Sequence, residues 1–353
     1  ITPPADDLEA ALVAIWEELL GAAPIGARDD FFALGGHSFH ALALMSAIEA
    51  ELGRRLPIAT LFREQTLEEL AAAVRATPGQ RAWSCLVPIQ PGRPGGRAPL
   101  FLVHPVGGGV LCYVELARAL GADLPIWGLQ AAGLAPDGVA DRDLGQMAAR
   151  YAEAVRAAHA GPYRLAGWSF GGVVAVELAS QLEAAGHPVE RVIAIDSWAR
   201  AARGESAAPP SEADRVRWFF GDLAGGRRDG LTRALANDAP LAELLARGLD
   251  LAREAQLVPL GTDPATIARL YDVFAANLAA RAAHTPRALA APLHLIKARH
   301  NPAGVDDLDH GWTAHASALE IAPVPGDHYS VLTRPHVAEA ARAIAAALGP
   351  ART

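Results

Sequence analysis

Lysine is almost absent from this chain of 353 residues, in which Lys297 is the only one and nearly all positive charge comes from arginine. A Walker A phosphate loop needs a lysine directly after a glycine, so this nucleotide site is excluded. Cysteine is scarce as well, with only Cys85 and Cys112, each among apolar neighbours. Two such residues form no disulfide framework and are typical of buried thiols in a reducing compartment, so we expect a cytoplasmic protein.

Long apolar runs are also missing, because Glu and Arg interrupt the Ala- and Leu-rich stretches at helical intervals. No stretch approaches the roughly 18 apolar residues of a membrane-spanning helix, so no membrane span is expected. The start, Ile1 to Asp7, lacks a methionine, a basic segment and an apolar core. We therefore expect no secretory signal and interpret the chain as a piece of a longer one.

The residues that are plentiful favour globular domains. Hydrophobic residues make up 51% of the chain and charged residues 20%, which is enough for sizeable cores, and the length predicts about two domains. Of the net charge of −8, residues 1–77 contribute −7, with 5 arginines against 12 acidic residues. An acidic domain repels nucleic acid; its charge suits a basic protein surface or serves solubility alone.

Residues 1–77 are predicted to form a small helical bundle. Leu8, Leu12, Ile15 and Leu19 share one helical face, and Gly21 follows where a helix should end. By the same spacing, a second helix is expected from Ser38 to about Leu52 and a shorter one from Thr66 to Val74.

After residue 77 the pattern changes. Residues 78–98 are predicted to be a linker that leads into a first edge strand, arranged as a hairpin. From residue 99 short apolar strands alternate with helical patterns, which predicts a mostly parallel sheet covered by helices. Residues from about 200 to 290 carry helical patterns only, and we interpret them as an inserted lid. The other expected elements are strands at 100–104, 163–166, 189–195, 293–296 and 319–321, and a last helix at 338–348.

A nucleophile motif lies between one of these strands and a helix. Gly167-Trp168-Ser169-Phe170-Gly171 has the Gly-x-Ser-x-Gly pattern in which two glycines permit the sharp turn that exposes a serine hydroxyl above a sheet. We predict an α/β-hydrolase fold with Ser169 as nucleophile. His328, directly after the last expected strand, is in the right place to be the general base.

The carboxylate partner of His328 has several candidates. Asp196 ends the uninterrupted apolar strand 192–195, whereas Asp306, Asp307 and Asp309 lie in a polar loop after the later strand. Hydrolases of this fold more often place the acid after the later strand, so the loop is not excluded. We favour Asp196 because it stands at the tip of an apolar strand, while the loop residues are expected to be solvated.

A glycine-rich loop, His104 to Gly109, follows the first strand of the expected sheet. From this position hydrolases supply one oxyanion amide, and the residue after the nucleophile supplies the other, so Val106 and Phe170 are the predicted donors. A dinucleotide motif counted from Gly107 fails, because its last glycine position is Cys112.

Other chemistry-bearing residues have weaker patterns. A group of histidines and aspartates lacks a His-Glu-x-x-His signature, so we expect a solvated loop and no metal; its members are His300, Asp306, Asp307, Asp309, His310 and His315. Cys112 is expected to be a core residue rather than a nucleophile. Trp168 and Phe170 are expected to pack between sheet and helix, with an acyl pocket as the alternative.

The chain as a whole resembles the C-terminal pair of a peptidyl carrier domain and a thioesterase domain in a non-ribosomal peptide synthetase. Asp30 to Ser38 is similar to the carrier motif, and the histidine before the serine is typical of peptidyl carriers. The resemblance implies that residues 1–77 are the carrier, that 99–353 are the thioesterase, and that Ser38 carries 4'-phosphopantetheine. A serine at a helix N-terminus suits this role, since the amides and positive dipole end favour a phosphodiester there.

The resemblance also implies an activity. A peptidyl chain held as a thioester would pass to Ser169 and leave by hydrolysis or macrocyclisation, and the family's acid after the earlier strand supports Asp196. The implied partners are a phosphopantetheinyl transferase and upstream condensation and adenylation domains of the same longer chain, without nucleic acid or membrane. Two alternatives stay open: an editing thioesterase that clears misloaded carriers, and a carrier-docking module without turnover.

Overall fold

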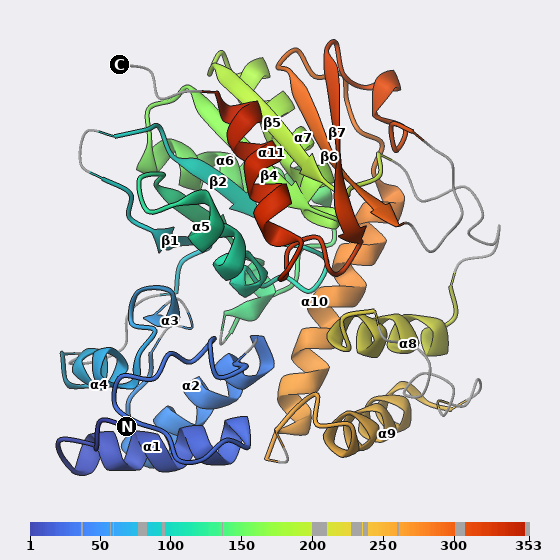
Figure 1. The fold of residues 1–353 in the computed structure, drawn as a ribbon. Helices are drawn as coiled ribbons and strands as arrows, with labels where there is room; N and C mark the ends of the chain where they lie inside the picture. The colour runs from blue at the N-terminus through green and yellow to red at the C-terminus, as the bar shows by residue number, and fades with distance from the viewer. Residues whose placement is uncertain are drawn as a thin grey trace. The chain divides into compact units, whose positions relative to one another are not determined.

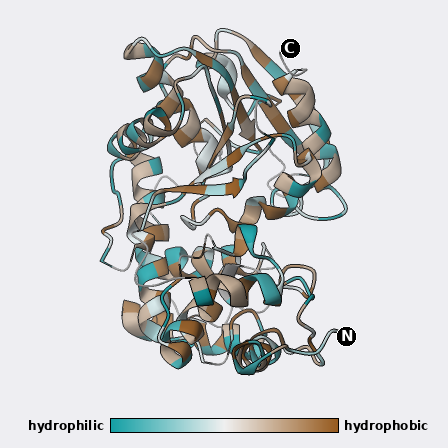
Figure 2. Cartoon of the chain, turned by 90° about the vertical axis from the view of Figure 1, so that its left-hand side faces the viewer, coloured by the Kyte–Doolittle hydropathy of each residue, from teal (hydrophilic) through white to brown (hydrophobic). Residues whose placement is uncertain are grey.

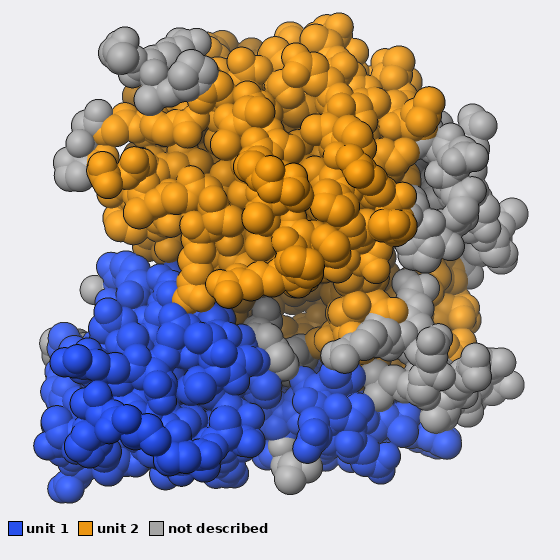
Figure 3. Space-filling view, viewed as in Figure 1, with its two compact units in different colours: residues 1–84, 242–267 blue, residues 85–241, 268–353 orange. Residues whose placement is uncertain are grey.

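The structure is a computed structural model, which describes residues 1–36, 38–56, 58, 60–76, 83–93, 96–135, 137–199, 210–226, 235, 239–259, 261–300 and 308–349. The chain divides into two compact units, drawn in different colours in Figure 3. The first unit consists of residues 1–84 and 242–267, and the second of residues 85–241 and 268–353.

The N-terminal part of the first unit is helical, as predicted (Figure 1). Its helices are α1 (Asp7–Leu20), α2 (Ser38–Leu52), α3 (Thr60–Arg63) and α4 (Leu67–Ala76). The Asp6 carboxylate caps the start of α1 by accepting from the Glu9 amide at 2.9 Å. At the other end Gly21 adopts the left-handed conformation, with φ of 60°, and stops the helix. Fully buried Trp16 meets Phe31 edge to face at 5.2 Å, at the centre of this small core.

The second unit is built on a seven-stranded sheet with the order β1-β3-β2-β4-β5-β6-β7. Its strands are β1 (Leu86–Gln90), β2 (Leu100–Val103), β3 (Ile126–Leu129), β4 (Tyr163–Trp168), β5 (Val189–Ile195), β6 (Leu293–His300) and β7 (Leu319–Asp327). Every neighbouring pair is parallel except β1 and β3. The predicted α/β-hydrolase class is therefore confirmed.

The expected edge hairpin is wrong. Strand β1 is at the edge of the sheet, but it pairs with β3 and not with the next strand along the chain, β2. The burial patterns give the physical reason. All four residues of β2 are buried, as in a central strand with both faces covered, and β3 and β4 pair with it on either side; β1 alternates between buried and half-buried residues, as a strand with one covered face does.

Helices cover both faces of the sheet (Figure 1). On one face α5 (Val114–Leu120) packs with α11 (Val337–Leu348), and on the other α6 (Leu144–Ala158) packs with α7 (Phe170–Ala184), which lies along β2, β4 and β5. Figure 2 shows hydrophobic residues, in brown, along the central strands. Three short 3-10 turns complete this unit, at Leu111–Tyr113 (η1), Ala132–Leu134 (η2) and Trp312–Ala314 (η3).

The regular elements among the described residues between β5 and β6 are helices, namely α8 (Glu212–Leu223), α9 (Leu241–Glu254) and α10 (Pro264–Ala283). Aromatic rings join two of them within the second unit: Phe219 of α8 lies 5.7 Å from Tyr271 and 5.6 Å from Phe274, both on α10. None of the helices in the described part of the chain is long and apolar enough to cross a membrane.

Candidate active site

The turn from β4 into α7 places Ser169 in a strained conformation, with φ of 57° and ψ of −121°. Strain of this kind is typical of a nucleophile elbow. The motif glycines are required by close backbone approaches. A Cβ atom on Gly167 would lie 2.2 Å from the Gly171 backbone, and one on Gly171 would lie 2.4 Å from the Val103 carbonyl oxygen. Helix α7 can therefore approach strands β2 and β4 closely, and the turn between β4 and α7 carries the Ser169 side chain.

Three side chains from distant parts of the second unit form a chain of hydrogen bonds. His328 Nε2 lies 3.0 Å from Ser169 Oγ, and His328 Nδ1 lies 2.7 Å from Asp196 Oδ2. Ser169 follows β4, Asp196 follows β5 and His328 follows β7, so the carboxyl ends of parallel strands bring them together. With a proton on Nδ1 donated to the carboxylate, Nε2 is left to accept the serine proton, which is the arrangement that general-base activation of a serine needs.

Asp196 is almost fully buried, and both of its carboxylate oxygens accept hydrogen bonds, since Oδ1 also accepts from the Ala298 amide at 3.0 Å. The competing Asp309 has another role. Its carboxylate accepts from the amides of Gly311 and Thr313 at 2.9 and 3.0 Å and so stabilises the turn that leads into η3. Asp306 and Asp307 lie outside the described residues. The contacts therefore favour Asp196 as the partner of His328.

Replacing Asp196 with asparagine is expected to lower kcat by about four orders of magnitude, because the amide favours the wrong imidazole tautomer while the shape of the site is kept. The measurement is steady-state turnover of a soluble acyl thioester. Asp309→Asn is the matched control and should retain activity. A loss seen with Asp307→Asn and absent with Asp196→Asn would assign the acid to the later loop.

Two tryptophans hold the segment that carries His328. Trp168 Nε1 donates to the His328 carbonyl oxygen at 3.0 Å, and the rings of Trp168 and Trp198 lie 5.3 and 5.5 Å from the imidazole. Trp168 therefore packs against the segment that carries His328, whereas the sequence predicted packing between the sheet and a helix. Trp198 was not among the predicted site residues, although its position two residues after Asp196 is a sequence signal that could have identified it.

The two predicted oxyanion donors are the backbone amides of Val106 and Phe170. Within the described ranges neither the Val106 nor the Phe170 N–H has a hydrogen-bond acceptor. Phe170 is the first residue of α7, where backbone N–H groups are left unpaired by the helix itself. An unpaired N–H group can donate to a developing oxyanion, and Phe170 directly follows Ser169 in the sequence.

Buried His104 braces the loop that contains Val106. Its Nδ1 lies 2.7 Å from the Pro105 carbonyl oxygen, its Nε2 lies 2.8 Å from the Tyr151 hydroxyl, and its ring stacks on Phe170 at 5.7 Å. Burial lowers the pKa of His104 to about 4, so the ring is neutral at neutral pH. A neutral ring can donate from Nδ1 to Pro105 and accept at Nε2 from Tyr151, which satisfies both nitrogens.

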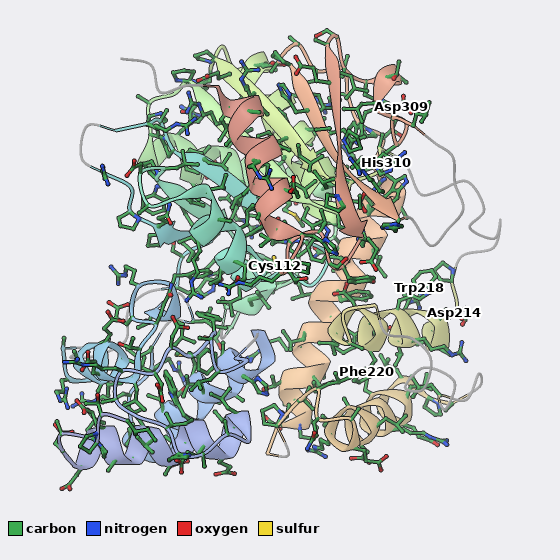
Figure 4. All side chains as sticks on the ribbon, in the orientation of Figure 1. Cys112, Asp214, Trp218, Phe220, Asp309 and His310 are labelled. Atoms are coloured by element: carbon green, nitrogen blue, oxygen red, sulfur yellow. The ribbon has the colours of Figure 1, made fainter. Side chains whose placement is uncertain are left out.

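The cysteines have no nucleophilic character. Burial raises the pKa of the Cys112 thiol far above its usual value and raises that of Cys85 too, so both stay protonated (Figure 4 labels Cys112).

The expected solvated loop is wrong for one residue of the predicted histidine and aspartate group. His310, labelled with Asp309 in Figure 4, is only 1% exposed and stacks on Trp198 at 4.1 Å. Its backbone carbonyl also accepts from the Ala199 amide at 2.8 Å, which ties this segment to the end of β5. No group of three potential metal ligands occurs among the residues that the structure describes.

Ser38 is the first residue of α2, as predicted, although His37 and the side chain of Ser38 lie outside what the structure describes. The turn before it depends on Gly35, with φ of 93°, and on Gly36, where a Cβ atom would lie 2.4 Å from the Phe31 ring. A serine that opens a helix of 15 residues offers a hydroxyl and first-turn amides. These groups fit the phosphodiester of 4'-phosphopantetheine.

Two protein families match the chain. The thioesterase domain matches residues 98–347, and the phosphopantetheine attachment site matches residues 10–74. Among curated relatives, a malpinin synthetase of Mortierella alpina is 40% identical over 55% of this chain and 2% of its own length. A dimodular nonribosomal peptide synthase of Bacillus subtilis is 39% identical over 54% of this chain and 8% of its own. An atromentin synthetase of Suillus grevillei is 28% identical over 95% of this chain, which spans 36% of that protein.

Solved structures of a synthetase and of thioesterase domains also match this chain. A four-domain nonribosomal peptide synthetase bound to AMP and glycine is 30% identical and superposes with a TM-score of 0.69, over 97% of this chain and 26% of that one. The NocB thioesterase domain, in covalent complex with a fluorophosphonate nocardicin G analogue, is 30% identical, with a TM-score of 0.50 over 73% of this chain and 96% of its own. The Vlm2 thioesterase domain, at 24% identity and a TM-score of 0.57, shares the fold over 75% of this chain and 98% of its own.

Proposed function

Because this chain belongs to the thioesterase domain family and carries a phosphopantetheine attachment domain ahead of that domain, we propose that it releases an acyl chain from a carrier-bound thioester through an acyl-enzyme on Ser169. The observation that carries the proposal is the hydrogen-bond chain from Ser169 through His328 to Asp196. The substrate class, a peptidyl thioester, is proposed from the synthetases that the chain resembles.

In the first half of the reaction Ser169 Oγ attacks the carbonyl carbon of the thioester while His328 Nε2 takes the hydroxyl proton. Asp196 holds the imidazole in the required tautomer and stabilises the imidazolium. The amides of Val106 and Phe170 donate to the oxyanion. When the tetrahedral intermediate collapses, the carbon–sulfur bond breaks and the thiolate takes the proton from His328. The acyl group is then an ester of Ser169.

In the second half a nucleophile removes the acyl group from Ser169. Water, or an amine or hydroxyl of the acyl chain itself, attacks the ester carbonyl and gives its proton to His328. The ester bond breaks and His328 returns the proton to Ser169 Oγ, which restores the site. Attack by water gives a free acid, and attack by an internal group gives a ring. The helices between β5 and β6 are proposed to cover the acyl chain and to decide between the two outcomes.

The carrier domain is the site of covalent 4'-phosphopantetheine attachment, and we assign that attachment to Ser38. When bound, this group supplies the thiol on which the acyl chain is carried. A phosphopantetheinyl transferase is the partner that this attachment requires. Condensation and adenylation domains of a longer synthetase are proposed as the source of the acyl chain. Tethering is useful because a short flexible link keeps two groups at an effective concentration of the order of millimolar.

Intact-protein mass spectrometry tests the proposal. The chain is incubated with a phosphopantetheinyl transferase and an acyl-coenzyme A, and any gain in mass is mapped to peptides. The expected result is acyl-phosphopantetheine on Ser38, followed by transfer of the acyl group to Ser169. An unmodified Ser38, under conditions that load a known carrier, would contradict the carrier assignment. Loading of Ser38 without any acyl group on Ser169 or any release would favour a docking module without turnover.

A further inference from the structure

Helix α10 turns one face toward the loop that carries Val106. Val273 and Asn277 are four residues apart and therefore lie on the same side of the helix. Asn277 is only 1% exposed, and its Nδ2 donates to the Val106 carbonyl oxygen at 2.7 Å. Val273 lies so close to Gly108 that a Cβ atom there would be 2.6 Å from its Cγ1. The helix thus contacts the loop through one apolar side chain and one buried amide.

The Asn277 contact restrains the peptide that follows one already held through its carbonyl oxygen. The Val106 N–H and the Pro105 carbonyl belong to one planar peptide group and point in opposite directions. Pro105 oxygen accepts from His104 Nδ1 at 2.7 Å and from the Gly108 amide at 2.9 Å. The next peptide, which contains the Val106 carbonyl, accepts from Asn277. Both peptides around Val106 are therefore restrained.

Helix α10 is itself braced, so it can hold the loop in place. In Figure 1 α10 runs from the sheet past α8. The ring of Phe219 on α8 contacts both Tyr271 and Phe274 on α10. The Tyr271 hydroxyl also donates to the Glu212 carboxylate at the start of α8. These side chains come from the same stretch of the helix as Val273 and Asn277, which leaves little freedom for the donor amide.

We propose that Asn277 is a positioning residue for the oxyanion hole, and that its bond to the Val106 carbonyl aims the Val106 N–H at the developing oxyanion. The inference rests on the proposed acyl-enzyme reaction at Ser169. A displacement of about 1 Å in such a donor can lower a rate by about two orders of magnitude. Asn277 therefore acts on the transition state and contributes little to substrate binding.

The test compares Asn277→Leu with the intact chain. Leucine has a similar volume and no donor. Asn277→Ala is the second variant, in case leucine disturbs the fold, and thermal unfolding reports the fold of each. Asp272→Asn, an exposed position on the same helix, is the matched control. Three quantities are measured: turnover of a soluble acyl thioester, affinity for a boronic acid that forms a tetrahedral adduct on serine, and affinity for an uncleavable thioether analogue of the substrate.

The Asn277 variants are expected to lose about 10- to 100-fold in kcat, with KM nearly unchanged. Boronic acid affinity should fall by a similar factor, and thioether affinity should stay the same. Unchanged kcat and boronic acid affinity in a folded variant would overturn the inference, as would an equal fall in both affinities, because Asn277 would then only shape the pocket. Failure of the proposed function is recognised separately, since the unmodified chain would then form no acyl-enzyme on Ser169.

Discussion

Ser169→Ala is expected to abolish the acyl-enzyme and to lower thioester turnover by about a million-fold, the order found when a serine nucleophile is removed from a triad. The reason is structural. In the variant His328 Nε2 has no hydroxyl to deprotonate, because Ser169 Oγ is the oxygen that lies 3.0 Å from it. Free amides alone support only the small residual catalysis that oxyanion stabilisation gives.

The measurement is single-turnover kinetics on an acyl thioester, with mass spectrometry of the protein during the reaction. Ser180→Ala, on the same helix α7 as the elbow, is the matched control and should behave as the unmodified chain does. Turnover that persists in Ser169→Ala at the unmodified rate would rule out the covalent mechanism. Acyl groups found on another residue would assign the nucleophile there.

The sequence predicted the elements that carry short, strongly patterned motifs. The bounds of α2 agree with the prediction, and α11 begins one residue before it. Strand β3 was not predicted. Ile126–Leu129 is a run of four residues with an interior glycine, which is too short to show a periodic pattern. Helix α3, also of four residues, was missed for the same reason. The hairpin error at β1 arose because sequence proximity favours pairing with the next strand.

The candidate site was predictable to the extent that each residue follows a strand. Ser169, Asp196 and His328 all do, and the structure places His328 within hydrogen-bond distance of both other side chains. Asn277 has no such signal. A single asparagine within a helix of 20 residues looks like any other, and its contact to Val106 joins positions 171 residues apart. Burial of His310 could not be predicted from the sequence either, because it depends on stacking against Trp198, which follows a different strand.

Ser38→Ala is expected to abolish pantetheinylation completely, because alanine has no oxygen to form the phosphodiester. Turnover of a small soluble thioester should remain at the level of the unmodified chain, since Ser169, Asp196 and His328 all belong to the other compact unit. The measurements are intact mass after treatment with a phosphopantetheinyl transferase and steady-state hydrolysis of the soluble substrate. Ser46→Ala is the matched control, a second serine on α2 at an exposed position.

The two readouts separate the roles of the two serines. If pantetheinylation stops and soluble turnover continues, the carrier contributes delivery and the thioesterase contributes chemistry. If both stop in a folded Ser38→Ala variant, the units are not separable in the way that the proposal requires. If pantetheinylation continues, the attachment is on another residue, and the match of residues 10–74 to the attachment-site family would have to be reconciled with a different serine. The Ser46→Ala variant then tests whether Ser46 is that residue. Ser46 lies on the same helix as Ser38 but away from the unpaired amides at the helix N-terminus.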